Sequence, residues 1–253
     1  MKIGIYDINN SSNLGYKERL DIYKKCGFTS VGIYLDDNYM TNNEKYIDII
    51  KYARKIKLEV NQIHVDYKIS NLICDEESNE YFDYIDNKIK ECLNLNIPYL
   101  VLHASKGEEA PLLGDKNLNK LKCMMEKHIN KNIYLCFENV RDNHNLDKIL
   151  NSNINNIRMC YDLGHAHAYS DEVELLNKYK NKIVCSHLHN NYGADSHNLL
   201  EDGEINYKSI ILSFNNGVDN CLEVFPLKDK VLDKNEFIKF VQKAYEEYKK
   251  IKF

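Results

Sequence analysis

Eight short apolar runs recur along this chain of 253 residues, and longer amphipathic stretches lie between most of them. Short runs rich in Val, Ile, Leu and Tyr favour strands, whereas apolar residues spaced three and four apart favour helices. Strands that alternate with helices pair in parallel, so eight such units predict a closed (β/α)8 barrel, with a doubly wound open sheet as the alternative. The expected strands are Lys2–Tyr6, Ser30–Tyr34, Glu59–His64, Tyr99–His103, Ile133–Glu138, Ile157–Asp162, Ile183–His187 and Asn220–Val224. The clearest expected helices are Tyr16–Cys26, Glu44–Lys57, Glu80–Leu95, Asn117–Ile129 and Asn235–Lys252.

Length and composition favour one soluble domain over residues 1–253. Barrels of this kind commonly use about 250 residues as a single domain. The formal net charge of −4 is ordinary, and no apolar stretch approaches the length of a membrane span. The first residues form an expected strand and not a signal peptide, so we expect a cytoplasmic protein. The eight cysteines include no C-x-x-C pair, which predicts buried free thiols in a reducing compartment.

Side chains that can bind metals mark the ends of six consecutive expected strands. In a (β/α)8 barrel the carboxyl ends of all the strands lie on one face, so side chains at these ends would converge there. A single polar residue at a strand end is unremarkable, but six in succession predict a site. The six are His64, His103, Glu138, Asp162, His187 and Glu223, and three more candidates, His165, Asp195 and His197, lie in the connections after the sixth and seventh strands.

The ligand types narrow the choice of metal. Carboxylate and imidazole groups without cysteine suit borderline divalent ions, so we expect Zn²⁺ or Mn²⁺, with Co²⁺ also possible. An all-oxygen set would have favoured Mg²⁺ or Ca²⁺. The Asp-x-x-His step at Asp162 and His165 and the Asp-x-His step at Asp195 and His197 let each short segment offer two ligands.

These residues resemble those of the xylose isomerase-like barrel superfamily. The resemblance rests on Glu138-Asn139, Asp162-Leu163-Gly164-His165, His187-Leu188-His189, Asp195-Ser196-His197 and Glu223, and it runs from His64-Val65-Asp66-Tyr67 almost to the end of the chain. That superfamily contains isomerases and epimerases of sugars and sugar phosphates. It also contains the endonuclease IV family of apurinic/apyrimidinic endonucleases.

The resemblance implies two nested sites. In the epimerase branch one metal is held by a Glu, Asp, His, Glu set, which here corresponds to Glu138, Asp162, His187 and Glu223. The endonuclease branch has a trinuclear zinc site, whose additional ligands correspond here to His64, His103, His165, Asp195 and His197. All these positions carry matching residue types, so the chain could hold one to three ions.

Two departures from the family pattern fall in the loop after the seventh strand. Many isomerase-like relatives have His-x-His-Asp-Asn where this chain has Asn190 in place of the aspartate, which we expect to remove a carboxylate beside the metal. Glu201 stands at the first position of a Gly-x-Gly pattern, and Asp202-Gly203 follows it. We expect both changes to lie over the substrate and to affect specificity.

The charges expected on the same face separate the two branches. A surface that binds DNA should present Lys and Arg to phosphates. The loops after the strands offer Lys68, Lys106, Arg141, Lys228 and Lys230, against Asp36, Asp37, Asp66, Asp75, Glu108, Glu109, Asp142, Glu201, Asp202, Glu204 and Asp229. This excess of carboxylates argues against nucleic acid as a partner, and we expect the Lys-rich terminal helix to lie on the outer ring.

The first functional hypothesis is therefore a metal-dependent isomerase or epimerase of a small carbohydrate. The metal would stabilise an enediolate, and Glu138 and Glu223 would act as the acid and base. His165, Tyr67 and His189 are candidates for substrate contact. The alternatives are an endonuclease IV-like phosphodiesterase and, third, a binding protein, which would be expected to lack one of the two glutamates. A homo-oligomer is possible.

The remaining histidines have simpler explanations. His128 lies in an expected helix and His144 in an expected turn, where satisfied or surface histidines are common. His167 can be a neighbour of the ligands, and Tyr192 a wall of the pocket.

Overall fold

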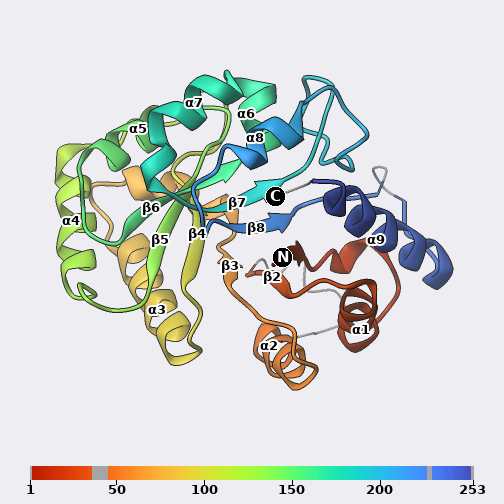
Figure 1. Ribbon diagram of the computed structural model, residues 1–253. Coiled ribbons are helices and arrows are strands. Elements are labelled where there is room, and N and C mark those ends of the chain that lie inside the picture. The colour runs from red at the N-terminus through yellow and green to blue at the C-terminus, as the bar shows by residue number, and fades with distance from the viewer. Residues whose placement is uncertain (1, 36–44, 227–229, 252–253) are drawn as a thin grey trace.

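Eight parallel strands pair in chain order and close into a barrel in the computed structural model, which describes residues 2–35, 45–226 and 230–251. The helices surround this barrel, and α1 and α9 lie side by side near the seam where β8 meets β1 (Figure 1). The strands are β1 Gly4–Tyr6, β2 Ser30–Tyr34, β3 Gln62–His64, β4 Tyr99–His103, β5 Tyr134–Glu138, β6 Ile157–Asp162, β7 Ile183–Leu188 and β8 Asp219–Leu222. The predicted barrel is confirmed, and the open sheet is wrong.

Most strand ends agree with the sequence, but β1, β3 and β8 are shorter than expected. Glu59 makes only an isolated bridge to Ser30, so β3 begins at Gln62. At the seam β8 pairs with β1 at only two positions, Cys221 and Leu222. Glu223 therefore lies one residue beyond its strand.

The five helices expected from their periodicity are all present. They are α1 Tyr16–Cys26, α2 Tyr46–Lys55, α3 Glu80–Asn94, α4 Asp115–Glu126 and α9 Lys234–Lys249, and the expected ends Glu44 and Lys252 lie outside the described residues. Four more helices have six to eight residues each, too short for a clear period: α5 His144–Asn151, α6 Leu163–Tyr169, α7 Glu172–Tyr179 and α8 Tyr207–Leu212. Short 3-10 helices span Asn9–Ser11, Tyr67–Cys74 and Lys180–Lys182. His144 begins α5, so its expected placement in a turn is wrong, and His128 follows α4 instead of lying within it.

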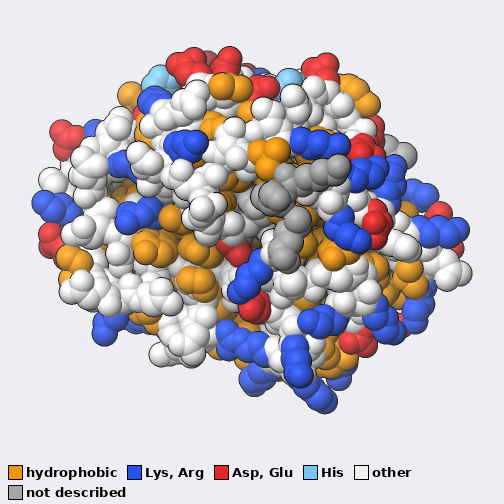
Figure 2. All heavy atoms as spheres, viewed as in Figure 1, with side chains coloured by type: hydrophobic (Ala, Val, Ile, Leu, Met, Phe, Trp, Pro, Cys, Tyr) orange, Lys and Arg blue, Asp and Glu red, His pale blue; other side chains and the backbone are white. Residues whose placement is uncertain are grey.

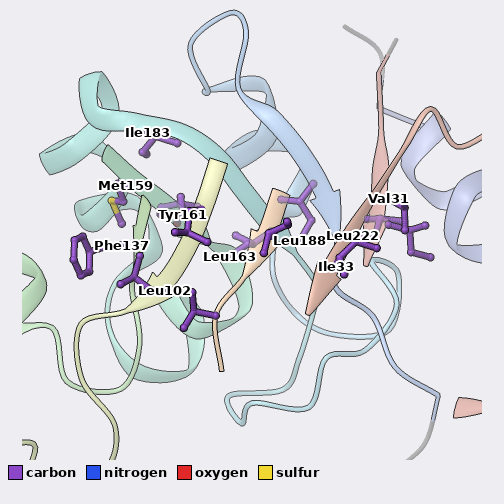
Figure 3. Packing of buried hydrophobic residues seen from close by; sticks show 14 of the residues in the cluster. Val31, Ile33, Leu102, Phe137, Met159, Tyr161, Leu163, Ile183, Leu188 and Leu222 are labelled. Atoms are coloured by element: carbon purple, nitrogen blue, oxygen red, sulfur yellow. The ribbon is translucent and has the colours of Figure 1, made fainter. Parts of the chain in front are cut away.

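Two apolar layers result from the alternation of side chains along the strands. The larger layer fills the space between barrel and helices, and Leu102, Phe137 and Met159 are among its members in Figure 3. A small separate layer inside the barrel consists of Val101, Cys136, Cys160 and Cys185. These cysteines are free thiols. They form the base on which the next inward-facing residues of the same strands stand.

Lysine and arginine side chains gather over α2 and beside α1 and α9 on the face shown in Figure 2. The Lys-rich helix α9 thus belongs to the outer ring, as predicted from the sequence. Among the helices of the described residues, none is both long enough and apolar enough to cross a membrane.

Candidate metal centre

The inward face of four successive strands delivers the central side chains. Glu138, Asp162 and His187 each stand two residues after an inward-facing cysteine, on β5, β6 and β7. Glu223 follows Cys221 of β8 in the same way. The ends of β5 and β6 are joined by Asn139, whose amide accepts from the backbone N–H of Asp162 and donates to its carbonyl, both at 2.8 Å. This bridge fixes the two carboxylates relative to each other.

Glu138, Asp162, His187 and Glu223, hereafter the central group, bring one ligand atom each within 4.8 Å of one another. His187 Nδ1 lies 3.2 Å from Glu138 Oε1 and 3.1 Å from Glu223 Oε2. It lies 3.8 Å from Asp162 Oδ2. Glu223 also accepts a hydrogen bond from the Tyr34 hydroxyl of β2. The central group thus converges on a single point at the carboxyl end of the barrel.

Three atoms of the central group are buried and have no hydrogen-bond partner within residues 2–35, 45–226 and 230–251. They are Asp162 Oδ2, His187 Nδ1 and Glu223 Oε2. Such atoms are suitable ligands for a cation. Leaving such atoms unsatisfied is costly, whereas a divalent ion would satisfy all three at once. The mixed carboxylate and imidazole donors suit Zn²⁺, Mn²⁺ or Co²⁺.

Electrostatics in the central group favour a positive charge. Burial alone would raise the pKa of Glu138 and Glu223, but the neighbouring histidines, His187 foremost, together outweigh it and hold the pKa of both carboxyls below the usual range. Burial would lower the pKa of His187, whereas Glu138, Tyr6 and Glu223 raise it well above its usual value. A divalent ion at this point would supply the positive charge that the buried carboxylates favour.

Two further histidines approach Glu138 from the neighbouring strands. His64 Nε2 of β3 lies 2.9 Å from Glu138 Oε2, and His103 Nε2 of β4 lies 3.4 Å from the same oxygen. His64, Glu138 and His187 form a second set of atoms that could hold an ion together. Burial, which outweighs the pull of Glu138, lowers the pKa of His103 and keeps its imidazole neutral. Glu138 can therefore serve more than one ion.

A second cluster, hereafter the outer group, consists of His165, His189, Asp195 and His197. It adjoins the central group, since His165 Nδ1 lies 3.2 Å from Glu138 Oε1 and His189 Nε2 lies 3.0 Å from Asp162 Oδ1. Asp195 Oδ2 lies 3.3 Å from His165 Nε2, and Asp195 Oδ1 lies 3.1 Å from His197 Nε2. The rings of His189 and His197 stack with centroids 3.9 Å apart. His189 can reach this position because residue 164 is glycine: a Cβ there would lie 1.9 Å from the His189 ring.

The long connection after β7 places the outer group over the barrel. Asn190 and Asn198 exchange backbone hydrogen bonds, and Phe225 N–H donates to the His197 carbonyl. His197 has a left-handed backbone, with φ of 50°. Its ring Nδ1 lies 2.9 Å from the Glu223 carbonyl oxygen, which ties the loop to the end of β8.

The two departures in this loop do not lie over the substrate as expected. The Asn190 side chain is buried and bonds within the loop, donating to the Leu200 carbonyl and accepting from the Ile205 N–H. Glu201 points to α9, where it pairs with Lys250 at 2.6 Å. Asn190 bonds inside the loop, Glu201 bonds to the end of α9, and neither lines the cavity, so the expectation that position 190 lies beside the metal is wrong.

A cavity of about 260 Å³ opens above the two groups and admits a small molecule. Its lining includes Tyr67 and His165, both expected to contact substrate, and also Tyr34 and Phe225, which sequence analysis missed. His189 is fully buried and is not part of the lining, so the structure gives no support to its expected contact with substrate. The lining is Tyr34, His64, Val65, Asp66, Tyr67, His103, Glu138, His165, Asp195, His197, Glu223 and Phe225.

Other candidate residues lie away from the cavity. Tyr192 is 65% exposed and bonds to Asp202, so it is not a wall of this cavity. His128 is buried against Asp86 at 2.7 Å, which is the satisfied histidine expected. His167 contacts Glu172 and Glu204 near the surface.

Carboxylates accompany most basic side chains expected on this face. Arg141 lies 2.5 Å from Glu108, and Lys230 lies 3.0 Å from Glu236. Lys106 Nζ lies over the Tyr67 ring, 4.9 Å from its centre. Lys68 is 3.9 Å from Asp66, and Lys228, Asp36, Asp37 and Asp229 lie outside the described residues.

Solved structures with the same fold include two sugar epimerases. The chain superposes on an L-ribulose 3-epimerase with a TM-score of 0.75 at 16% identity, covering 98% of this chain and 94% of the other. For a D-psicose 3-epimerase with D-tagatose from Clostridium cellulolyticum H10 the TM-score is 0.76 at 11% identity, covering 99% of both chains. A third similar structure, the IOLI protein with a bound zinc atom, has a TM-score of 0.74 at 16% identity, covering 98% and 97%.

Sequence comparison gives the family directly. No curated protein matches the chain. The family model described as the xylose isomerase-like TIM barrel matches residues 20–239, which span seven of the eight strands completely and all nine ligand candidates. The chain belongs to the xylose isomerase-like TIM barrel family.

Proposed function

We propose that the protein is a divalent-metal-dependent isomerase or epimerase of a sugar or sugar phosphate. The observation that carries the proposal is the pair Glu138 and Glu223, which line one small cavity and contribute to one unsatisfied ligand set. The three similar structures, two of which are named as sugar epimerases, add support at the level of fold.

The central group would hold the ion, with Glu138, Asp162, His187 and Glu223 as ligands. When bound, a divalent ion supplies Lewis acidity that polarises a carbonyl oxygen and makes the adjacent C–H more acidic. Both glutamates are ionised because their pKa values are lowered, so either can take up that proton.

The two carboxylates reach the cavity from different strands. Glu138 ends β5 and is held by His64, whereas Glu223 follows β8 and is held by Tyr34. Epimerisation results when one glutamate takes up the C–H proton and the other, after accepting a proton from solvent, donates that proton to the opposite side of the carbon. His165 and Tyr67, which also line the cavity, would orient the substrate hydroxyl groups.

Solvent deuterium exchange tests this proposal without advance knowledge of the product. Protein loaded with Mn²⁺, Zn²⁺ or Co²⁺ is incubated in D₂O with a panel of ketoses and ketose phosphates, and loss of the C–H signal beside the carbonyl is followed by ¹H NMR. We expect exchange with at least one compound, reduced about 10²–10⁴-fold in Glu223→Gln. Absence of exchange across the panel in metal-loaded protein would contradict the proposal.

A second candidate is a metal-dependent phosphodiesterase of the endonuclease IV type, with three zinc ions. It is favoured by the three ligand sets, two of which share Glu138 and His187 and which together involve eight of the nine residues expected from that branch, and by His103 beside Glu138. The pairing of Arg141 and Lys230 with carboxylates weighs against a phosphate-binding track. Cleavage of a duplex with an abasic site, together with about three zinc ions per chain, would favour this candidate over the first.

A further inference from the structure

A chain of hydrogen bonds crosses the interior of the barrel beneath the central group. Gln62 Nε2 of β3 donates to Asp219 of β8, at 2.8 Å to Oδ2 and 2.9 Å to the backbone carbonyl. The Tyr6 hydroxyl of β1 donates to Gln62 Oε1 at 3.2 Å. The same hydroxyl oxygen lies 3.1 Å from His187 Nε2. Gln62, Tyr6 and His187 are all buried, so water does not compete for these bonds.

The Asp219 end of this series of hydrogen bonds determines the direction of every bond in it. The Asp219 backbone carbonyl can only accept, so the Gln62 amide nitrogen faces it and the amide oxygen faces Tyr6. An amide oxygen also can only accept, so the one hydroxyl hydrogen of Tyr6 points to Gln62. The Tyr6 oxygen then offers only lone pairs to His187, and the hydrogen between them belongs to Nε2.

Packing holds the Tyr6 ring in this position. Its ring lies 4.8 Å from the His187 ring at 83°, and 4.6 Å from the Tyr34 ring. Residue 32 must be small, since a Cβ there would lie 2.7 Å from the Tyr6 ring. Burial raises the pKa of Tyr6 well above its usual value, so the hydroxyl keeps its hydrogen.

We propose that Tyr6 and Gln62 are positioning residues that hold His187 with its hydrogen on Nε2, and so present the Nδ1 lone pair to the metal. Nδ1 is the atom that lies 3.1 to 3.2 Å from the two glutamates, and it has no hydrogen-bond partner among residues the structure describes. Outer partners of a ligating histidine select its tautomer and orientation. The proposal rests on the metal site proposed above, but not on the identity of the substrate.

Two variants test the proposal by different routes. Tyr6→Phe keeps the ring but removes the acceptor for Nε2–H. Gln62→Met keeps the length of the side chain but removes the acceptor for the Tyr6 hydroxyl, which can then turn and donate to Nε2, placing the His187 hydrogen on Nδ1. We expect both variants to bind Zn²⁺ and Mn²⁺ about 10–100-fold more weakly, in titrations against a chromogenic chelator.

A matched control is Tyr179→Phe, which removes the hydroxyl of a buried tyrosine that donates to Asp147 between outer helices. We expect this variant to bind metal as the wild type does. Wild-type affinity in both Tyr6→Phe and Gln62→Met would overturn the proposal. Weaker binding in Tyr179→Phe as well would show a loss of stability only, and would equally overturn it.

Nitrogen NMR of histidine-labelled, metal-free protein separates this inference from the metal site itself. At a pH where the His187 ring is neutral, we expect the hydrogen on Nε2 in the wild type and on Nδ1 in Gln62→Met. A wild-type hydrogen on Nδ1 would overturn the inference even if metal binds. If the wild type bound no metal, the proposed metal site would fail, while this measurement would still decide the role of Tyr6 and Gln62.

Discussion

The central and outer groups use the same side-chain chemistry but differ in how they are held. The central group stands at or just beyond strand ends, and its four residues are at most 6% exposed. In the outer group Asp195 and His197 come from the loop after β7, and the Asp195 side chain is 28% exposed. The first is built into the barrel, whereas the second depends on a connection that closes over it.

The difference decides which group requires an ion. In the described part of the chain, three residues of the central group each have an unsatisfied ligand atom, whereas in the outer group the unsatisfied atoms belong to His189 alone and each oxygen of Asp195 already faces a histidine. Burial would lower the pKa of His197, yet Asp195 and Glu223 raise it to about 9. The protonated pair therefore stabilises the metal-free loop fully below the ordinary histidine pKa of about 6.5, and this contribution is lost as the pH rises through about 9. We infer that the central group loads first.

Glu138→Gln should give the largest effect, because Glu138 belongs to two of the three ligand sets. We expect loss of the first ion, held by the central group, and a fall in deuterium exchange of about 10²–10⁴-fold. Metal content per chain and the exchange rate measure the two effects. Glu247→Gln is the control, since Glu247 is a buried glutamate of α9 that accepts from the Glu201 N–H. A Glu138→Gln protein that keeps its metal would break the distinction between the groups.

Asp195→Asn should affect the outer group alone. The amide keeps the size of the side chain but loses the charge that faces His165 and His197. We expect affinity for any ion beyond the first to fall by about tenfold or more, with the first ion retained. Stoichiometric titration with Zn²⁺ distinguishes the two sites. Loss of the first ion in this variant would show that the groups act as one site.

The barrel and the central group were predictable from sequence because both follow a period of two. Cys136, Cys160, Cys185 and Cys221 each precede a ligand candidate by two residues, so a common inward face could be inferred from the sequence alone. The same spacing places Gln62 beneath His64, a signal that sequence analysis did not use. The ends of β3 and β8 were less predictable, since pairing with neighbouring strands determines them: β2 and β4 for β3, and β1 across the seam for β8.

The loop after β7 was predictable in length but not in orientation. Position 190 was expected beside the metal because Asn190 replaces the aspartate of the family's His-x-His-Asp-Asn pattern, yet its amide bonds to Leu200 and Ile205. Contacts that close a loop depend on distant residues, and no local period reveals them. For the same reason the contact of Phe225 with the cavity could not be inferred from its neighbours.

Asn190→Asp tests this orientation and should have a smaller effect than Asp195→Asn on metal. A carboxylate cannot donate to the Leu200 carbonyl, so we expect a loss of about 1–3 kcal/mol in unfolding free energy. The number of bound ions should stay unchanged. Denaturant unfolding and metal titration measure the two quantities. An additional bound ion in this variant would place residue 190 beside the metal after all.

The smallest effect concerns a histidine–carboxylate pair outside both groups. His128 contacts Asp86 at 2.7 Å on the outer helices, and this pair belongs to none of the three ligand sets in the described residues. Burial would raise the pKa of Asp86, but Lys90 and His128 lower it below the usual value. The folded pKa is thus below the unfolded one, and the resulting stability is present above about pH 3.9 and is lost as the pH falls through the folded pKa.

Asp86→Asn should therefore reduce stability by about 1–2 kcal/mol at neutral pH, with the difference from wild type shrinking below about pH 4. Denaturant unfolding from pH 7 to 3.5 measures the difference, with and without a chelator. His128 and Asp86 bind each other and no metal, so the chelator should leave the stability difference between Asp86→Asn and wild type unchanged. The chelator should still lower the stability of each protein that retains the central ion. A difference that depends on the chelator would mean that the outer helices and the metal centre do not behave independently.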